Sequence, residues 1–182
     1  MDLSCLLPFT FRGLYYVRHL DIQESDLGTI ESDAFTGISH IDNINILNNK
    51  IDFIKEFKLT NDSIVESLKF HGNHVLRAPN ARDTDLQVHN ISAIDNYFPC
   101  DCHIHELFDS DFVNGSIVEF RRKNYCISPL EFNGRPMSHI DFDSIARCHD
   151  NFVKDNLGSS AHMHFTIRSL LYVVTMIFYA VR

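Results

Sequence analysis

Four cysteines in the C-terminal half of the sequence could act together, as disulfides or as metal ligands. They are Cys100, Cys102, Cys126 and Cys148, and Cys5 stands apart from them. The segment CDCHIH adds His103 and His105, and thiolates and imidazoles are good zinc ligands. Structural zinc sites usually place about two to four residues between paired cysteines, whereas only Asp101 separates Cys100 from Cys102. We therefore favour two local disulfides and a spare thiol, with three pairings open, and zinc is the rival interpretation.

N-glycosylation sequons, which begin at Asn61, Asn90 and Asn114, accompany the cysteines. Disulfides persist in oxidising compartments outside the cytosol, so we expect an extracellular protein. The N-terminus does not have the pattern of a signal peptide, because residues 1–11 open with an acid and are interrupted by Pro8.

The sequence repeats with a period of 24 residues over more than three units. A shift of that length superposes apolar residues in several columns: Leu20, Ile44 and Leu68; Ile22, Ile46 and Phe70; Leu27, Ile51 and Val75; Ile30, Ile54 and Ala78; Val17, Ile41 and Val65; Phe11, Phe35 and Leu59. A polar column contains Asn49 and Asn73, with Ser25 at the matching position of the first unit.

Each column has a physical reason. Leu20-x-Ile22 and its copies alternate as a short strand does, with one side chain inward and the next outward. The asparagine follows the strand, where a buried amide can bond backbone groups of neighbouring units that would otherwise be unsatisfied. Ser25 can do part of this, and the phenylalanine column closes the opposite side.

These residues resemble the extracellular leucine-rich repeat family, over the stretches LDIQESDLGTIESDAFTGI, INILNNKIDFIKEFKL and LKFHGNHVLRAPN. The resemblance covers residues 3–94 and loosens after Pro79. A last unit, Leu86-x-Val88 leading to Ile94, departs from the 24-residue spacing. The resemblance implies an α/β fold, a leucine-rich-repeat solenoid with short parallel strands on its concave face.

The repeat pattern is already under way at Met1. Leu3 and Leu6 lie 24 residues before Leu27 and Ile30, and FRGL lies 24 residues before FTGI. An uncapped repeat would leave its apolar edge open to water. We therefore expect this sequence to be a fragment or an incomplete gene product whose missing part carries further repeats, an N-terminal cap and the signal peptide.

The cysteine segment resembles the C-terminal cap of the same family. That pattern is C-x-C with a short helix, then a cysteine before Ser-Pro, a glycine loop and a last cysteine, and here it falls on CDCHIHELF and NYCISPLEFNGRPMSHIDFDSIARC. The resemblance implies the bridges Cys100–Cys126 and Cys102–Cys148. It departs at residues 97–99, Tyr-Phe-Pro, where Phe98 can fill the core position of the family's tryptophan.

The sequence ends in an apolar run over residues 169–181, followed by Arg182. As a helix it would be about 20 Å long, short of a bilayer core of about 30 Å. Small residues at 158–161 and a spacer precede it, which resembles a glycosylphosphatidylinositol attachment signal with Ser159 as the preferred site. A lipid anchor, a strained transmembrane helix and a buried core helix are the alternatives, and we favour them in that order.

We expect no enzyme and no cofactor, because the sequence has no G-x-S-x-G, H-E-x-x-H or glycine-rich phosphate loop. Three acids, Glu131, Asp141 and Asp143, are interpreted as polar loop residues of the cap and not as a catalytic cluster. The net charge of −8 argues against a nucleic-acid partner, and the basic run at residues 121–123 is short enough to be ordinary surface.

The concave strand face remains as a candidate binding surface. Its expected outward side chains are His19, Asp21, Gln23, Asn43, Asn45, Leu47, Ser67, Lys69 and His71. This polar row suits a protein ectodomain or a glycan, so we expect a recognition or adhesion module on the extracellular face of the plasma membrane. The alternative is a structural or anchoring segment of a larger receptor or matrix protein.

The expected organisation has four parts. Repeats occupy residues 1–94, beginning with a partial one, and the cysteine-rich cap occupies 95–149. A polar linker follows over residues 150–168, and a hydrophobic membrane-anchor tail over 169–182.

Overall fold

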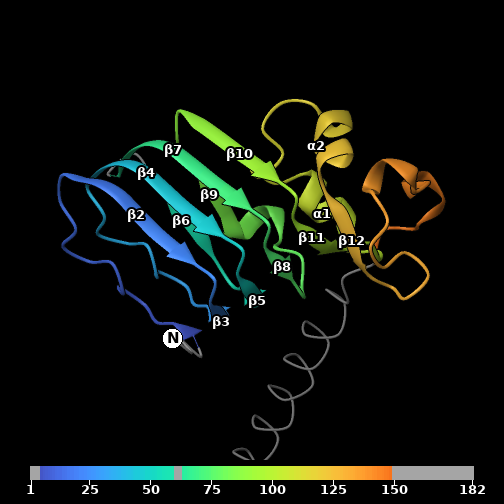
Figure 1. The fold of residues 1–182 in the computed structure, drawn as a ribbon, viewed down its shortest axis with the longest axis horizontal. Helices are drawn as coiled ribbons and strands as arrows, with labels where there is room; N and C mark the ends of the chain where they lie inside the picture. Colours follow the sequence, from blue (N-terminus) through green and yellow to red (C-terminus); the bar gives the residue numbers. More distant parts are fainter. Residues whose placement is uncertain (1–4, 60–62, 149–182) are drawn as a thin grey trace, which may run out of the picture. The chain divides into compact units, whose positions relative to one another are not determined.

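The computed structural model describes residues 5–59 and 63–148, and those up to Arg147 belong to one structural unit. The fold is mixed α/β, with mostly parallel strands arranged in sheets (Figure 1). This confirms the expected fold class at the level of its secondary structure.

The longest strands form a sheet of four in the described part of the chain, in the order β10-β7-β4-β2. Their bounds are β2 Val17–Gln23, β4 His40–Leu47, β7 Ile64–His71 and β10 Asn90–Ile94. All pairs are parallel, and Leu20 lies beside Ile44, which lies beside Leu68. The columns that begin at Leu20 and Ile22 are therefore rows of inward side chains in this sheet.

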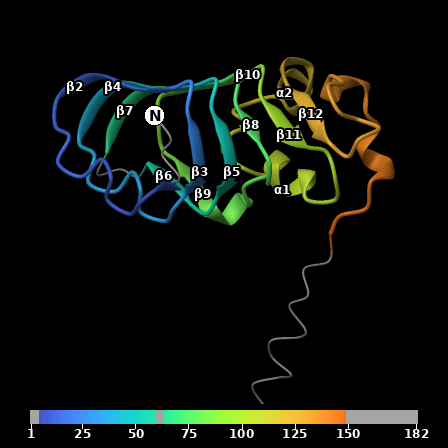
Figure 2. The same cartoon turned by 60° about the horizontal axis from the view of Figure 1, so that its bottom comes forward.

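A second sheet runs alongside, in the order β1-β3-β5-β8-β11-β12 over the described residues (Figure 2). Its strands are β1 Cys5–Leu6, β3 Asp26–Ile30, β5 Lys50–Ile54, β8 His74–Val75, β11 Tyr97–Pro99 and β12 Tyr125–Ser128. A short pair, β6 Phe57–Leu59 and β9 Thr84–Leu86, is also parallel. The chain thus passes from one sheet to the other and back in each repeat.

The turn from the first sheet to the second uses the same backbone conformation each time. Glu24, Asn48, Gly72 and Asp95 all have positive φ, between 51° and 67°. Each of these residues immediately precedes the asparagine column or its serine. At Gly72 a Cβ atom would come within 2.1 Å of the Asn48 Oδ1, so glycine is suited to this turn for space as well as for φ.

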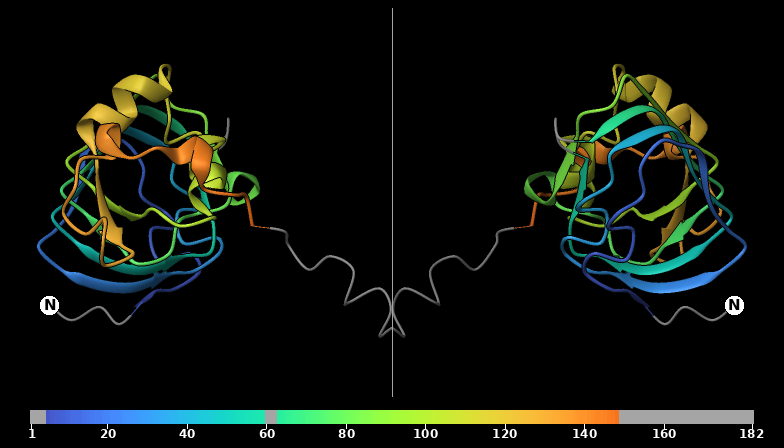
Figure 3. Two further views of the ribbon diagram at one scale, coloured as in Figure 1. Left: turned by 90° about the vertical axis from the view of Figure 1, so that its right-hand side faces the viewer. Right: turned by 90° about the vertical axis from the view of Figure 1, so that its left-hand side faces the viewer.

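The two sheets face each other across the interior of the fold, as the end-on views show (Figure 3). Aliphatic side chains and stacked phenylalanines fill the space between the sheets. Phe35 lies between Phe11 and Phe57, with ring centroids 5.1 and 4.6 Å away. Phe112 then continues the row from Phe57 to Phe70. The expected partner Leu59 is also buried, but Phe57 takes the stacking position.

The buried asparagines form a ladder that crosses the units. Asn73 accepts a hydrogen bond from the Asn49 backbone N–H (3.0 Å) and donates to the Ile46 carbonyl (2.8 Å). The same pattern links Asn49 to Ser25, Asn96 to Asn73 and Asn124 to Asn96. These side chains are at most 1% exposed. The expectation that the asparagine column bonds neighbouring backbone is confirmed.

The last repeat differs from the expectation. Leu86 lies in β9 beside Leu59, and the row of Leu68 and Phe70 continues instead with Ile91 and Ala93 in β10. The interpretation of Leu86-x-Val88 as the buried strand motif is therefore wrong. The deciding residue is Asn96, which joins the ladder at a separation of 23 residues from Asn73.

Helices appear after β11, in the cysteine-containing segment. They are α1 Ile104–Phe108 and α2 Ile117–Lys123, with 3₁₀ turns at Met137–His139 and Phe142–Ser144. A further 3₁₀ turn, Ala81–Asp83, lies before β9. Phe120 of α2 packs on Phe98 and Phe108, and Phe108 packs on Phe142. Phe98 is fully buried, in agreement with the core position expected for it.

Replacing a ladder asparagine should destabilise the fold strongly. Asn73→Ala leaves the Asn49 backbone N–H and the Ile46 carbonyl buried without their partners, at about 1–3 kcal/mol for each unsatisfied group. We expect the free energy of unfolding, measured by urea denaturation with the disulfides intact, to fall by about 3 kcal/mol. Asn133→Ala, at an exposed position, should change it by less than about 0.5 kcal/mol. Equal effects of the two substitutions would contradict the ladder's role.

Candidate ligand-binding surface

The outward side chains of the four-stranded sheet form three rows across the strands. In sheet order from β2 to β10 the rows are His19, Asn43, Ser67 and Asn90; Asp21, Asn45, Lys69 and Ser92; and Gln23, Leu47, His71 and Ile94. Every residue expected on the ligand face therefore lies on one face of one sheet. The parallel register brings side chains from separate units next to one another.

The middle row carries the closest polar contacts. Asn45 Nδ2 donates to Asp21 Oδ1 at 2.6 Å, which aligns the amide across β2 and β4. The other amide atom, Asn45 Oδ1, is buried and has no hydrogen-bond partner in the described part of the chain. A buried unpaired acceptor is costly, so it favours a donor from outside the sheet.

His71 lies beside this row and bonds to the next strand. Its Nε2 is 2.8 Å from the Ser92 Oγ. Burial lowers the pKa of His71, and the Lys69 charge lowers it further, while Asp95 and the contact with Ser92 oppose these effects. The imidazole is therefore held towards its neutral form.

Two of the three sequons lie in the described residues. Asn90 is exposed at the start of β10 and ends the row of His19, Asn43 and Ser67. Asn114 is exposed in the loop before α2, and Asn61 lies outside the described residues. Sequence analysis treated the Asn90 sequon apart from the ligand face, because the register of β10 was assigned to other residues.

The cysteines confirm the prediction of disulfides. A disulfide joins Cys100 to Cys126, with Cα atoms 5.5 Å apart, and Cys102 and Cys148 are disulfide-bonded as well. Cys5 is a free, partly buried thiol. The CDCHIH cysteines thus provide no thiolate for zinc, and the His105 Nε2 lies 2.8 Å from the Ile145 carbonyl oxygen.

The acidic and basic residues of the cysteine-rich segment have local structural contacts. Asp141 accepts a hydrogen bond from the Asp143 backbone N–H at the start of a 3₁₀ turn. The Arg121 guanidinium lies 4.7 Å from the centre of the Phe142 ring, and Arg122 pairs with Glu119. The Asp141, Arg121 and Arg122 side chains therefore have partners within the cysteine-rich segment.

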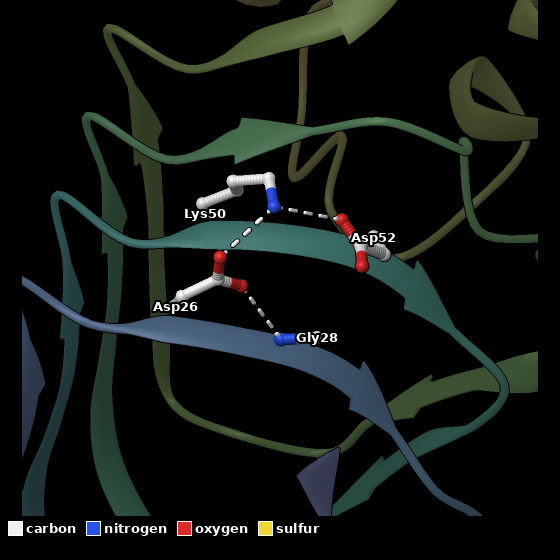
Figure 4. Close-up of polar contacts among 4 residues, drawn as sticks. All are labelled: Asp26, Gly28, Lys50 and Asp52. Carbon is white, nitrogen blue, oxygen red and sulfur yellow. Dashed lines mark hydrogen bonds and ion pairs between the residues drawn. The ribbon is translucent and has the colours of Figure 1, made fainter. Parts of the chain in front are cut away.

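The outer face of the six-stranded sheet carries a row that sequence analysis missed. Lys50 on β5 contacts Asp26 on β3 at 2.9 Å and Asp52 at 3.4 Å, and the Gly28 backbone N–H also donates to Asp26 (Figure 4). The Lys50 hydrogen bond lowers the pKa of Asp26, and the Asp26 hydrogen bond raises the pKa of Lys50. Only the 24-residue register could have revealed this pairing.

Beyond the charged residues, the same row continues with aromatic side chains. His74 on β8 lies beside Lys50, and its ring centroid is 4.5 Å from that of Tyr97. Tyr97 stacks on Tyr125 at 5.2 Å. Charged and aromatic side chains thus pair with one another along this row.

The predictions of a membrane anchor concern residues outside the described part of the structure. They concern Ser159 and the segments 150–168 and 169–182. Within residues 5–59 and 63–148, no helix is both long and apolar enough to cross a bilayer.

No protein family, curated protein or solved structure matches this chain in the comparisons.

His71 should titrate with a pKa below the ordinary histidine value. Burial and Lys69 place the His71 pKa below its ordinary value of 6.5, and Lys69→Gln should raise it again. Both shifts can be followed by the imidazole NMR signals during a pH titration. Because the unfolded chain takes up this proton first, the free energy of unfolding should decrease as the pH falls through 6.5 towards the folded-state pKa. A His71 midpoint above 6.5 would contradict the assignment.

Proposed function

We propose that the chain is a leucine-rich-repeat solenoid with a disulfide-bonded C-terminal cap, and that it is a recognition or adhesion module without catalytic activity. The single observation that supports this most is the regular register of the four-stranded sheet. It joins each strand to the next unit at a separation of 24 residues from β2 to β7. Such arrays present extended faces to their ligands.

The chemistry of the face favours a polar partner. His19, Asp21, Gln23 and Lys69 are exposed, and Asn43, Asn45 and His71 are partly buried beside them. Amides, a carboxylate and an ammonium group give both donors and acceptors within one sheet. A protein ectodomain or a glycan can match that mixture, and a donor from it would satisfy the Asn45 Oδ1.

The place of action that we propose is the outer cell surface. Disulfides are typical of oxidising compartments, and the exposed Asn90 and Asn114 could both accept glycans. The tail would hold the protein in the membrane, by a lipid at Ser159 or by its apolar segment.

Charge reversal on the face should separate recognition from a purely structural role. Lys69→Glu and His71→Glu should each weaken binding to cells or to an immobilised glycan or ectodomain array by about tenfold or more, as for a central contact. Lys50→Glu is the matched control, because Lys50 is an exposed lysine on the other sheet. The unfolding midpoint of each variant should be measured alongside binding.

Two results would reject the recognition role. Binding that survives both substitutions would favour the structural or anchoring alternative. Equal loss in the Lys50→Glu control would show that surface charge in general, and not this face, is responsible.

Peptide mass mapping without reduction should establish the covalent structure. Protein from a secretory host should give the linked peptides of Cys100 and Cys126 and glycans on Asn90 or Asn114. Loss of the peptide after Ser159 would favour the lipid anchor, and its retention would favour a membrane span. Reduced cysteines and bare asparagines would contradict the extracellular proposal.

A further inference from the structure

One of the glycosylation sequons lies on the ligand face itself. Asn90 is the first residue of β10, and its side chain is exposed. Its Cα atom pairs with that of Ser67, so Asn90 ends the outward row that begins at His19. The alternation along the strand supports this orientation, because Ile91 and Ala93 pack against the core. Asn90 therefore projects from the same face as the proposed ligand contacts.

This position brings Asn90 close to the exposed ammonium group of the ligand face. Ser92, two residues further along β10, lies opposite Lys69 on β7, as Asn90 lies opposite Ser67. Neighbouring strands are about 4.8 Å apart and two residues of a strand span about 6.6 Å, so the Cα atoms of Asn90 and Lys69 are about 8 Å apart. A group that is attached to Asn90 and longer than this separation reaches over Lys69.

The other side of β10 is bordered by the chain. Figure 1 shows α2 and the loop before it beside this strand. A hollow of about 100 Å³ lies there, and its lining includes Ser92, Ile94, Asn114 and Lys123. The Ala93 carbonyl accepts a hydrogen bond from Asn124, which also belongs to the segment after the sheet. A group on Asn90 thus has protein on one side and the open sheet face on the other.

We propose that Asn90 carries an N-linked glycan that lies over the β10 side of the ligand face and limits access to it. The inference rests on the proposed recognition function and adds the regulation of that function by a covalent modification. N-glycans are bulky and solvated, so this one covers Ser67 and Lys69 for part of the time and leaves the β2 side open. The apparent affinity for a ligand falls with the fraction of time in which the face is uncovered.

The modification uses a lipid-linked oligosaccharide as its co-reactant. The Asn90 Nδ2 forms a bond to the anomeric carbon of the oligosaccharide, and the bond from that carbon to the pyrophosphate of the lipid breaks. The Nδ2 loses one proton, and the lipid pyrophosphate is the leaving group. The sequon also requires the Ser92 hydroxyl, which lies 2.8 Å from the His71 Nε2. A test should therefore replace Asn90 and not Ser92, whose loss would also disturb the ligand face.

Amine labelling tests the coverage without any ligand. The full chain, from a secretory host that makes high-mannose glycans, is acetylated, and the rates at Lys69 and Lys50 are compared by mass spectrometry. Asn90→Gln should raise the Lys69 rate about threefold and leave the rate of Lys50, which is exposed on the other sheet, unchanged. Trimming the wild-type glycans to one N-acetylglucosamine with an endoglycosidase should have the same effect. Asn133→Gln, at an exposed asparagine outside any sequon, is the matched control and should change neither rate.

Binding to cells supplies the second readout. Asn90→Gln should raise the affinity about three- to tenfold, because the face is then always uncovered. Asn114→Gln should have a smaller effect, since Asn114 lies in the loop before α2 and not on a strand of the ligand face. After trimming, the wild type and Asn90→Gln should bind equally, which separates the effect of the glycan from that of the side chain.

The outcomes distinguish this proposal from the recognition function on which it rests. An unmodified Asn90 in the glycopeptide map would overturn the proposal, and so would equal Lys69 labelling in the wild type and Asn90→Gln. Binding that Lys69→Glu still weakens would then leave the recognition function standing. Unchanged binding despite an uncovered Lys69 would overturn the regulatory role alone. Absence of binding by every form, trimmed or not, would reject the recognition function together with its regulation.

Discussion

The buried asparagine ladder is the constraint on which the rest of the structure depends. Each amide has to reach the backbone N–H of the previous unit and a strand carbonyl at the same time, as Asn73 does with Asn49 and Ile46. These bonds fix the position at which every strand ends. They also remove polar backbone groups from an apolar interior, where unpaired groups would be costly. The number of residues in a unit can therefore vary only between one ladder residue and the next.

The number of residues between successive ladder residues shows this variation. The ladder bonds join residues separated by 24 residues at Asn49 and Asn73, by 23 at Asn96 and by 28 at Asn124. The longest interval accommodates α2, and Asn124 bonds to the Phe120 carbonyl near the end of that helix. The register of the strands stays the same because the ladder bonds recur from unit to unit, while the backbone between the ladder residues changes from loop to helix. The outward rows of the four-stranded sheet follow directly from this register.

The sequence predicted what depends on a constant period and missed what does not. Leu20, Ile44 and Leu68 repeat at equal spacing, so their strands and inward orientation could be recognised. Asn96 could not, because its spacing differs by one residue and Leu86-x-Val88 imitates the strand motif. The ion pair of Lys50 with Asp26 follows the same 24-residue spacing, but neither residue belongs to an apolar column, so the column pattern did not single it out. Phe57 takes the stacking position expected of Leu59, because stacking depends on the direction of a side chain as well as on its position in the repeat.

Within the described residues, the two ends of the ladder differ in chemistry. At one end, Asn124 donates to the Ala93 carbonyl and to a helix carbonyl, and the disulfide of Cys100 with Cys126 ties the neighbouring strands together. At the position of Ser25, the hydroxyl donates to the Gln23 carbonyl of its own strand. A ladder amide is therefore satisfied within the chain and held beside a covalent bridge at the first end, whereas the Ser25 position provides a hydroxyl in place of an amide.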